Sequence, residues 1–165
     1  MDFVEFREIL VDEAATCRIA ESLSRIARPG DFIALSGDLG AGKSTFARAF
    51  IRAALDDSEA EVPSPTFTLV QEYDHPDGYP LFHADLYRLT PGDDMEDLGL
   101  DDEQPNAVML IEWPDRLPDG WHNNVLHIKL ELQAAGSGER LMLVHSSNHS
   151  WLNKLSDSGI IGAEA

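Results

Sequence analysis

The clearest hydrophobic pattern of the chain lies in two neighbouring segments. Residues 32–35 form a short apolar run that is typical of a buried strand, and residues 46–55 carry apolar side chains at helical spacing among strong helix formers. A second apolar run, residues 107–114, is continuous and holds one carboxylate, Glu112, near its end. Because continuous apolarity indicates burial on both faces, we expect this run to be a central parallel strand.

Weaker patterns predict the other elements. Strands are expected at residues 3–10, 69–73, 80–87, 125–132 and 140–145, and a helix is expected from about Asp12 to Ala27. The segments 69–73 and 80–87 flank a turn rich in proline, glycine and aspartate, which predicts a strand pair. Two prolines exclude a helix from residues 62–68, which we interpret as a loop. A short helical piece is expected at Met95 to Leu98.

The length of the chain predicts one domain. A chain of 165 residues with 43% apolar content can bury a real core. From Ser146 onward the pattern is weak until a short helix at Trp151 to Leu155, and chain termini of this kind are often poorly ordered. We therefore predict a single α/β domain at residues 1–150 and a C-terminal tail at residues 151–165.

A phosphate-binding loop lies between the first predicted buried strand and the helix that follows it. The residues read Gly37-Asp38-Leu39-Gly40-Ala41-Gly42-Lys43-Ser44-Thr45 and match the form G-x-x-x-x-G-K-[ST]. Glycines allow successive backbone N–H groups to point at one anion, and the helix N-terminus adds its dipole there. Lys43 would reach the β- and γ-phosphates of a triphosphate, and the Ser44 hydroxyl would ligate Mg²⁺. The order of strand, loop and helix predicts a nucleotide site formed by Asp38 to Thr45.

Two acidic residues at strand ends are candidates for the chemistry. Glu112 should emerge at the carboxyl edge of a central strand, where phosphate loops also open, and Asp85 ends another predicted strand. Glu112 could complete a Mg²⁺ shell with Ser44, and Asp85 could be a second acid of that shell or could polarise the attacking water. The alternative is that both are ordinary solvent-facing acids. Trp113 either covers the site or belongs to the core, and His83 is expected to be a structural histidine.

The charge of the chain argues against direct nucleic-acid binding. Thirty acidic residues against twelve basic ones give a net charge of −18, and such a field repels a phosphate backbone. The acidity indicates either simple solubility or a basic partner. No apolar stretch is long enough to span a bilayer and no basic, apolar leader is present, so we expect a cytoplasmic protein without a membrane partner.

Taken together, these segments resemble the TsaE (YjeE) family, small bacterial ATPases required for threonylcarbamoyladenosine formation on tRNA. The matching motifs, in chain order, are Asp12-Glu13-Ala14-Ala15-Thr16, the phosphate loop, Ser64-Pro65-Thr66-Phe67-Thr68-Leu69-Val70, His83-Ala84-Asp85-Leu86-Tyr87-Arg88 and Ile111-Glu112-Trp113-Pro114. The resemblance covers residues 3–145, and the ordered set of motifs is far more specific than any one of them. Ser44 stands where the family more often has threonine, a change that keeps the hydroxyl ligand.

The resemblance implies a P-loop NTPase-like, three-layer sandwich with a mixed central sheet of about seven strands flanked by helices. It implies binding and hydrolysis of ATP rather than GTP, with Lys43 in the site and Mg²⁺ held by Ser44 and Glu112. By the same resemblance Asp85 is an essential acid and Trp113 matters for activity.

Further roles are implied for loops and partners. Ser64 and Thr66 would belong to a switch-like loop, and Thr16 and Arg140 fall near nucleotide-contacting positions of the family. Family members act with TsaD and TsaB, of which TsaD transfers the threonylcarbamoyl group to tRNA. This chain would then reach tRNA only indirectly, through that complex.

Three other functions compete with a partner-stimulated ATPase. A small-molecule kinase usually carries an arginine-rich lid, whereas the nine arginines here are scattered. A GTP-driven switch usually carries N-K-x-D, and the sequence at Asn153-Lys154 lacks the aspartate. A nucleotide-sensing adaptor that barely hydrolyses ATP fits the same motifs.

Overall fold

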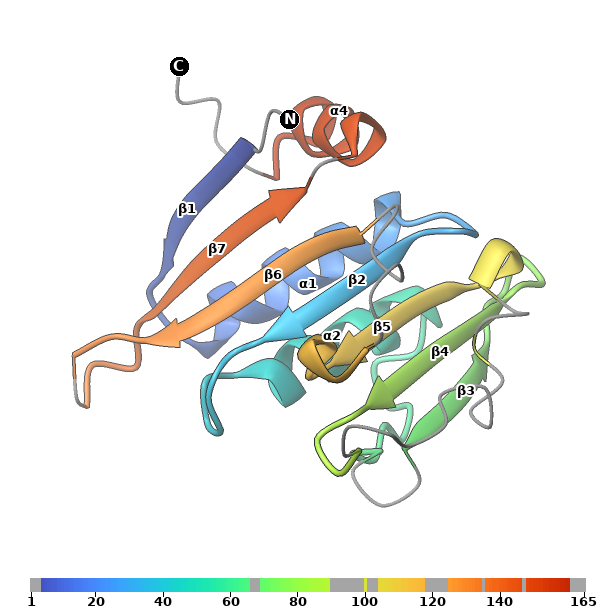
Figure 1. Cartoon of the computed structure of the whole chain (residues 1–165), viewed down its shortest axis with the longest axis horizontal. Helices are drawn as coiled ribbons and strands as arrows, with labels where there is room; N and C mark the ends of the chain where they lie inside the picture. The colour runs from blue at the N-terminus through green and yellow to red at the C-terminus, as the bar shows by residue number, and fades with distance from the viewer. Residues whose placement is uncertain are drawn as a thin grey trace.

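The computed structural model of the chain describes residues 4–65, 69–89, 100, 104–117, 125–134, 136–146 and 148–160. Within them, seven strands form one sheet in the order β1-β7-β6-β2-β5-β4-β3 (Figure 1). The strands are β1 (Val4–Leu10), β2 (Phe32–Ser36), β3 (Val70–Asp74), β4 (Pro80–Asp85), β5 (Val108–Glu112), β6 (Val125–Leu132) and β7 (Arg140–Ser146). The same residues form helices α1 (Glu13–Ile26), α2 (Lys43–Ala54) and α4 (His149–Ser158), and the short 3-10 helices η2 (Gln104–Asn106) and η3 (Pro114–Arg116).

The sheet is parallel at its centre and antiparallel toward its edges. β2 runs parallel to both β5 and β6, and β4 runs parallel to β5. The pairs β1 and β7, β6 and β7, and β3 and β4 are antiparallel. Every residue of β5 is buried, so the prediction of a central parallel strand is confirmed. Because β2, β4 and β5 point the same way, their carboxyl ends with Ser36, Asp85 and Glu112 meet at one edge of the sheet.

Apolar side chains on the two faces of the sheet form two clusters. On the face covered by α1 and α2, Leu35 and Leu110 belong to the same core as Phe46 of α2, and both helices lie behind the sheet in Figure 1. On the opposite face, Leu86 and Leu117 contribute from loops to a second cluster. The predicted α/β fold, with three layers and a mixed sheet of about seven strands, is therefore confirmed.

Helix α1 begins where the sequence places its cap. The Asp12 side chain accepts a hydrogen bond from the backbone N–H of Ala15 at 2.8 Å, which satisfies one of the free donors at the helix start. The side chains of Ala20 and Leu23 face the core, and α1 packs along α2. The cap fixes the first turn of α1 at the same edge of the sheet as the phosphate loop.

Helix α4 contains the short helix expected at Trp151 to Leu155 and packs on the main core. Trp151 and Leu155 are 0% and 1% exposed and belong to the main core, so the boundary predicted at residue 150 falls inside a packed helix. These residues are four positions apart, which places both on one helix face. Asn148 caps the helix through Ser150, and the Lys154 ammonium lies 2.6 Å from the Asp31 carboxylate. Through these contacts α4 packs on the same core as α1 and α2.

Some predictions fall outside the described residues. These are the helical piece at Met95 to Leu98 and Thr66 of the switch-like loop. Among the residues that the structure describes, no helix combines the length and apolarity needed to cross a membrane. The cytoplasmic location stays a prediction.

Candidate functional site

The phosphate-binding loop joins the end of β2 to the start of α2, as predicted. Gly42 at the helix N-cap has φ 108° and Gly37 has φ 139°, backbone conformations that side-chain-bearing residues rarely adopt. A Cβ on Gly37 would also collide with the carbonyl of Leu130 on β6. Among the described residues, no side chain caps the first turn of α2, so its N–H groups can face an anion.

Lys43 is buried at the centre of this site. Lys43 is only 6% exposed, and its ammonium donates to the backbone carbonyl of Gly37. Burial lowers the pKa of Lys43, while the nearby carboxylates of Glu112, Asp85 and Asp38 oppose that shift. A bound anion would favour the charged form further, as expected for a lysine that holds phosphate.

Trp113 lies against Lys43. The Lys43 ammonium is 3.9 Å from the ring centroid of Trp113, and the Tyr87 ring lies 4.9 Å from the same indole. Trp113 has φ 59°, a left-handed conformation that costs energy for a residue with a bulky side chain. The backbone N–H of Trp113 donates to the backbone carbonyl of Leu35. The chain thus turns sharply after Glu112 and brings the indole over the lysine. Trp113 also packs against the second apolar cluster, so the structure supports both interpretations of Trp113.

Asp85 and Glu112 occupy paired positions at the ends of β4 and β5. They are 7% and 3% exposed, so the alternative of ordinary solvent-facing acids is wrong. Both line the same cavity as Lys43 and Ser44. The Asp85 carboxylate accepts from the backbone N–H of Tyr87 at 3.0 Å, which holds it at the strand end.

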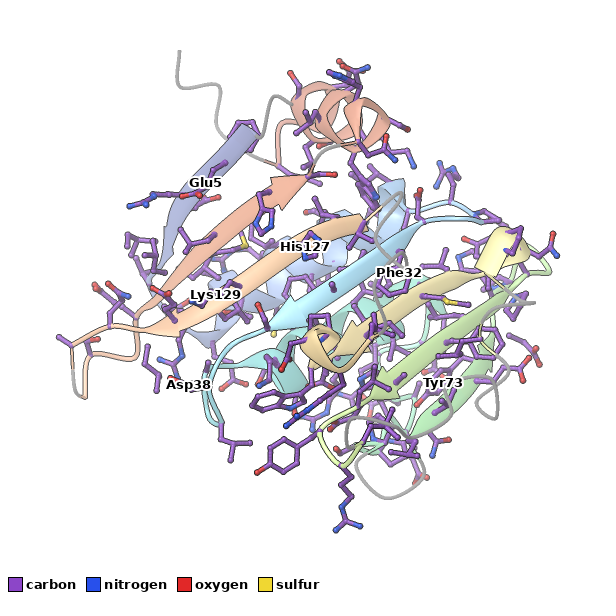
Figure 2. All side chains as sticks on the ribbon, viewed as in Figure 1. Glu5, Phe32, Asp38, Tyr73, His127 and Lys129 are labelled. Carbon is purple, nitrogen blue, oxygen red and sulfur yellow. The ribbon has the colours of Figure 1, made fainter. Side chains whose placement is uncertain are left out.

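The cavity has a volume of 450 Å³ and is bounded by four parts of the chain. Its walls come from the start of α1, the phosphate loop with the start of α2, the strand ends with Ser64 and Trp113, and the turn before β7: Val11, Asp12, Glu13, Thr16, Leu39, Gly40, Gly42, Lys43, Ser44, Thr45, Ser64, Asp85, Glu112, Trp113, Ser137, Gly138 and Arg140. Thr16 and Arg140, which the resemblance brought to the site, are both present. Asp38 is exposed and Ala41 is buried in the core; neither lines the cavity (Figure 2 labels Asp38).

Arg140 contacts the loop directly. Its Nε donates to the carbonyl of Ala41 at 3.0 Å and its Nη2 to that of Gly40 at 3.3 Å. These bonds join the start of β7 to a loop about a hundred residues earlier in the chain. Arg140 therefore braces the phosphate loop, a role that the sequence pattern did not predict. The neighbouring Gly136-Ser137-Gly138 turn was also missed, although its small residues were a signal for a tight turn beside a ligand.

His83 forms a buried pair with Glu112. The distance from His83 Nε2 to Glu112 Oε2 is 2.7 Å, and the two side chains are 3% and 4% exposed. His83 is structural in the sense predicted, because it is buried and hydrogen-bonded, but its partner is a candidate catalytic acid. Its other ring nitrogen, Nδ1, is buried and has no hydrogen-bond partner among the residues that the structure describes.

The donors around the cavity fit Mg²⁺. Ser44, Asp85 and Glu112 offer a hydroxyl and two carboxylates, the hard oxygen ligands that this ion prefers. Within the described part of the chain, no group of three or more His, Cys, Asp or Glu residues is arranged to hold a metal unaided. Magnesium usually binds through one or two protein ligands together with waters and substrate phosphates, so this sparse donor set suits it.

Comparison with known proteins agrees with these features. The family model described as "Threonylcarbamoyl adenosine biosynthesis protein TsaE" matches residues 10–141. The chain belongs to the TsaE family. The matched segment contains the phosphate loop, both acids, Trp113 and Arg140.

Individual members of the TsaE family match most of the chain. The tRNA threonylcarbamoyladenosine biosynthesis protein TsaE of Bacillus subtilis is 39% identical over 132 residues, which are 79% of this chain and 78% of that protein. The protein of the same name from Rickettsia felis is 29% identical over 156 residues, 94% of this chain and 90% of that protein. The crystal structure of Bacillus subtilis YdiB superposes with a TM-score of 0.72 and 28% identity, and covers 96% of this chain and 97% of that one.

Proposed function

We propose that this chain binds ATP with Mg²⁺ and hydrolyses it, slowly alone and faster with TsaD and TsaB, in the formation of threonylcarbamoyladenosine on tRNA. The observation that carries the ATPase proposal is one 450 Å³ cavity that combines a phosphate loop, its lysine and two buried carboxylates. The part in tRNA modification rests on membership of the TsaE family and on the names of its relatives. The two partners rest on the family resemblance stated from the sequence motifs.

Each part of the site has a task in this proposal. The loop N–H groups and Lys43 bind the β- and γ-phosphates and stabilise charge that develops on them during cleavage. The Ser44 hydroxyl and Glu112 hold Mg²⁺, which supplies positive charge to the phosphate oxygens when bound. Asp85 is proposed to orient the attacking water. The buried setting strengthens these electrostatic interactions, because fewer waters compete with them.

The walls of the cavity favour hydrolysis over transfer to a small molecule. A kinase lid normally places several arginines over the transferred phosphate. Among the described residues that line the cavity, Arg140 is the one arginine, and its guanidinium is bonded to loop carbonyls. The acceptor of the phosphoryl group is therefore proposed to be water.

The test is ATP hydrolysis measured with and without TsaD and TsaB from the same organism. We expect slow release of phosphate by the chain alone, and a higher rate with both partners. Binding of ATP without stimulated hydrolysis would replace the proposal with a nucleotide-sensing adaptor. Consumption of ATP without release of inorganic phosphate, as a small molecule becomes phosphorylated, would replace it with a kinase.

A further inference from the structure

The pair formed by His83 and Glu112 links two neighbouring strands beneath the candidate site. His83 lies on β4, two positions before Asp85, and Glu112 ends β5. Because alternate residues of a strand share a face, His83 and Asp85 both point to the side of the sheet that α2 covers. In the register of β4 and β5, Asp85 stands opposite Glu112 and His83 stands opposite Leu110. His83 therefore lies two residues behind Asp85 on the same face of β4, where it can hold Glu112, and it is not among the residues that line the cavity.

The chemistry of the two groups indicates which atom carries the hydrogen in the bond between His83 and Glu112. When Glu112 acts as a metal ligand its carboxylate is ionised and only accepts hydrogen bonds, so Nε2 of His83 then donates to Oε2 of Glu112. In a neutral imidazole the other nitrogen then carries a lone pair and no hydrogen. Within the described part of the chain, Nδ1 of His83 is buried without a partner, and an unpartnered lone pair costs less free energy there than an unpartnered N–H. The geometry fits a hydrogen on Nε2, the nitrogen that faces Glu112.

Glu112 has one oxygen committed to this bond and still borders the cavity. A glutamate side chain has three rotatable torsions, and a free one would sample several positions at the strand end. The bond to His83, whose backbone is held in the sheet by both neighbouring strands, removes that freedom. Carboxylates that ligate metals are commonly held by such outer hydrogen bonds, and loss of the bond typically costs about 10- to 100-fold in metal affinity or activity.

We propose that His83 is a positioning residue, which fixes the carboxylate of Glu112 so that its remaining oxygen is presented to Mg²⁺ in the nucleotide complex. This inference rests on the proposed function, since it assumes that Glu112 acts on Mg²⁺. It goes further in that it assigns the orientation of that ligand to a residue outside the cavity. His83 acts through Glu112 and touches neither nucleotide nor metal.

Two variants separate this role from simple core packing. In His83→Gln the amide nitrogen reaches about as far from the backbone as Nε2 does, so it can donate to Glu112. In His83→Asn the same amide is one methylene shorter and cannot reach. Both variants place an amide at position 83. They differ by design in how far that amide reaches toward Glu112.

The readout is the gain in affinity that Mg²⁺ gives to a non-hydrolysable ATP analogue, measured by calorimetry with and without the ion. We expect His83→Asn to lose about 10-fold or more of that gain, His83→Gln to keep most of it, and binding without Mg²⁺ to stay unchanged in both. If the two variants behave alike, whether both keep the gain or both lose it, the positioning role is wrong. If wild-type protein shows no gain with Mg²⁺ at all, the metal role of Glu112 falls, and this inference falls with it.

A measurement on the unaltered chain covers the case in which the variants do not fold. Nitrogen-15 spectra of the histidine side chains should show His83 with its hydrogen on Nε2, and its Nε2 resonance should move when Mg²⁺ is added to the analogue complex. A hydrogen on Nδ1, or a resonance that ignores Mg²⁺ while the nucleotide signals respond, would overturn the inference and leave the proposed ATPase intact.

Discussion

The ammonium of Lys43 lies 3.9 Å from the ring centroid of Trp113 while it donates to the carbonyl of Gly37. A cation over an indole face is attracted to the ring, and the contact is stronger when water is excluded. In a phosphate loop this same lysine binds the β- and γ-phosphates. Binding of nucleotide would therefore compete with the ring for the ammonium, which links phosphate occupancy to the surroundings of Trp113.

Trp113 should report nucleotide binding through its fluorescence. Movement of the Lys43 charge toward phosphate changes the electric field at the indole, so we expect the emission to shift or change in intensity with saturating ATP analogue. The chain has three tryptophans, and Trp113→Phe should abolish the response. Trp151→Phe should retain it, because Trp151 is buried in the core with α4. A full response in Trp113→Phe would mean that the lysine and the ring are not coupled.

Replacement of Lys43 by alanine should abolish tight binding of ATP without unfolding the protein. The change removes a charge-assisted contact to phosphate but little core packing. The matched control is Lys129→Ala, since Lys129 is half exposed on β6 beside Glu131 and does not line the cavity. Calorimetric titration with Mg·ATP decides between them. Equal affinities of the two variants would show that the loop is not the nucleotide site.

The strand, loop and helix around the motif could be predicted because their signals are local. The apolar run of β2, the glycines and the helical spacing in α2 each lie within a few residues. The meeting of Asp85 and Glu112 could also be predicted, because parallel strands bring their carboxyl ends to one edge. What each acid does there stays a prediction.

Contacts between side chains that are distant in the sequence could not be predicted from local sequence patterns. The bond of His83 to Glu112 spans 29 residues, and Arg140 reaches Ala41 across 99. The sequence held one indication for His83. It lies two positions before Asp85 in a predicted strand, so the two side chains point to the same face of the sheet. Helix α4 was underestimated because Trp151 and Leu155 are its only buried side chains, and their burial depends on a core assembled elsewhere.

Both acids should matter more for turnover than for binding. Asp85→Asn and Glu112→Ala remove groups proposed to act on the attacking water and on charge at the γ-phosphate, and loss of one such group costs on the order of a hundredfold or more in rate. The measurement is partner-stimulated hydrolysis at saturating ATP, with binding checked separately. Glu139→Ala, a partly buried acid just before β7 that does not line the cavity, provides a control acid. Near-normal rates in both site variants would leave the two acids without a catalytic role.

Trp151→Ala should destabilise the whole domain. Trp151 is fully buried, and truncation of a buried aromatic to alanine typically costs about 3–5 kcal/mol. The effect should appear in urea unfolding as a lower midpoint with a single transition. Asn153→Ala on the exposed side of the same helix is the control, and it should change stability little. A small effect of Trp151→Ala, or a separate early transition, would mean that α4 is an independent appendage.

The isolated chain should not bind tRNA measurably near physiological salt, although its proposed pathway ends in a modified tRNA. Contacts from lysine and arginine to phosphates supply most of the non-specific affinity for nucleic acids. In this chain the net charge of −18 repels the phosphate backbone and opposes such contacts. Of the twelve cationic side chains, Lys43 is buried, Arg140 is bonded to the phosphate loop and Lys154 is paired with Asp31. Anisotropy titrations with labelled tRNA at low and moderate salt, first with the chain alone and then with TsaD and TsaB, separate direct binding from recruitment. Tight, salt-sensitive binding by the chain alone would contradict the argument from charge and make this component a direct tRNA contact.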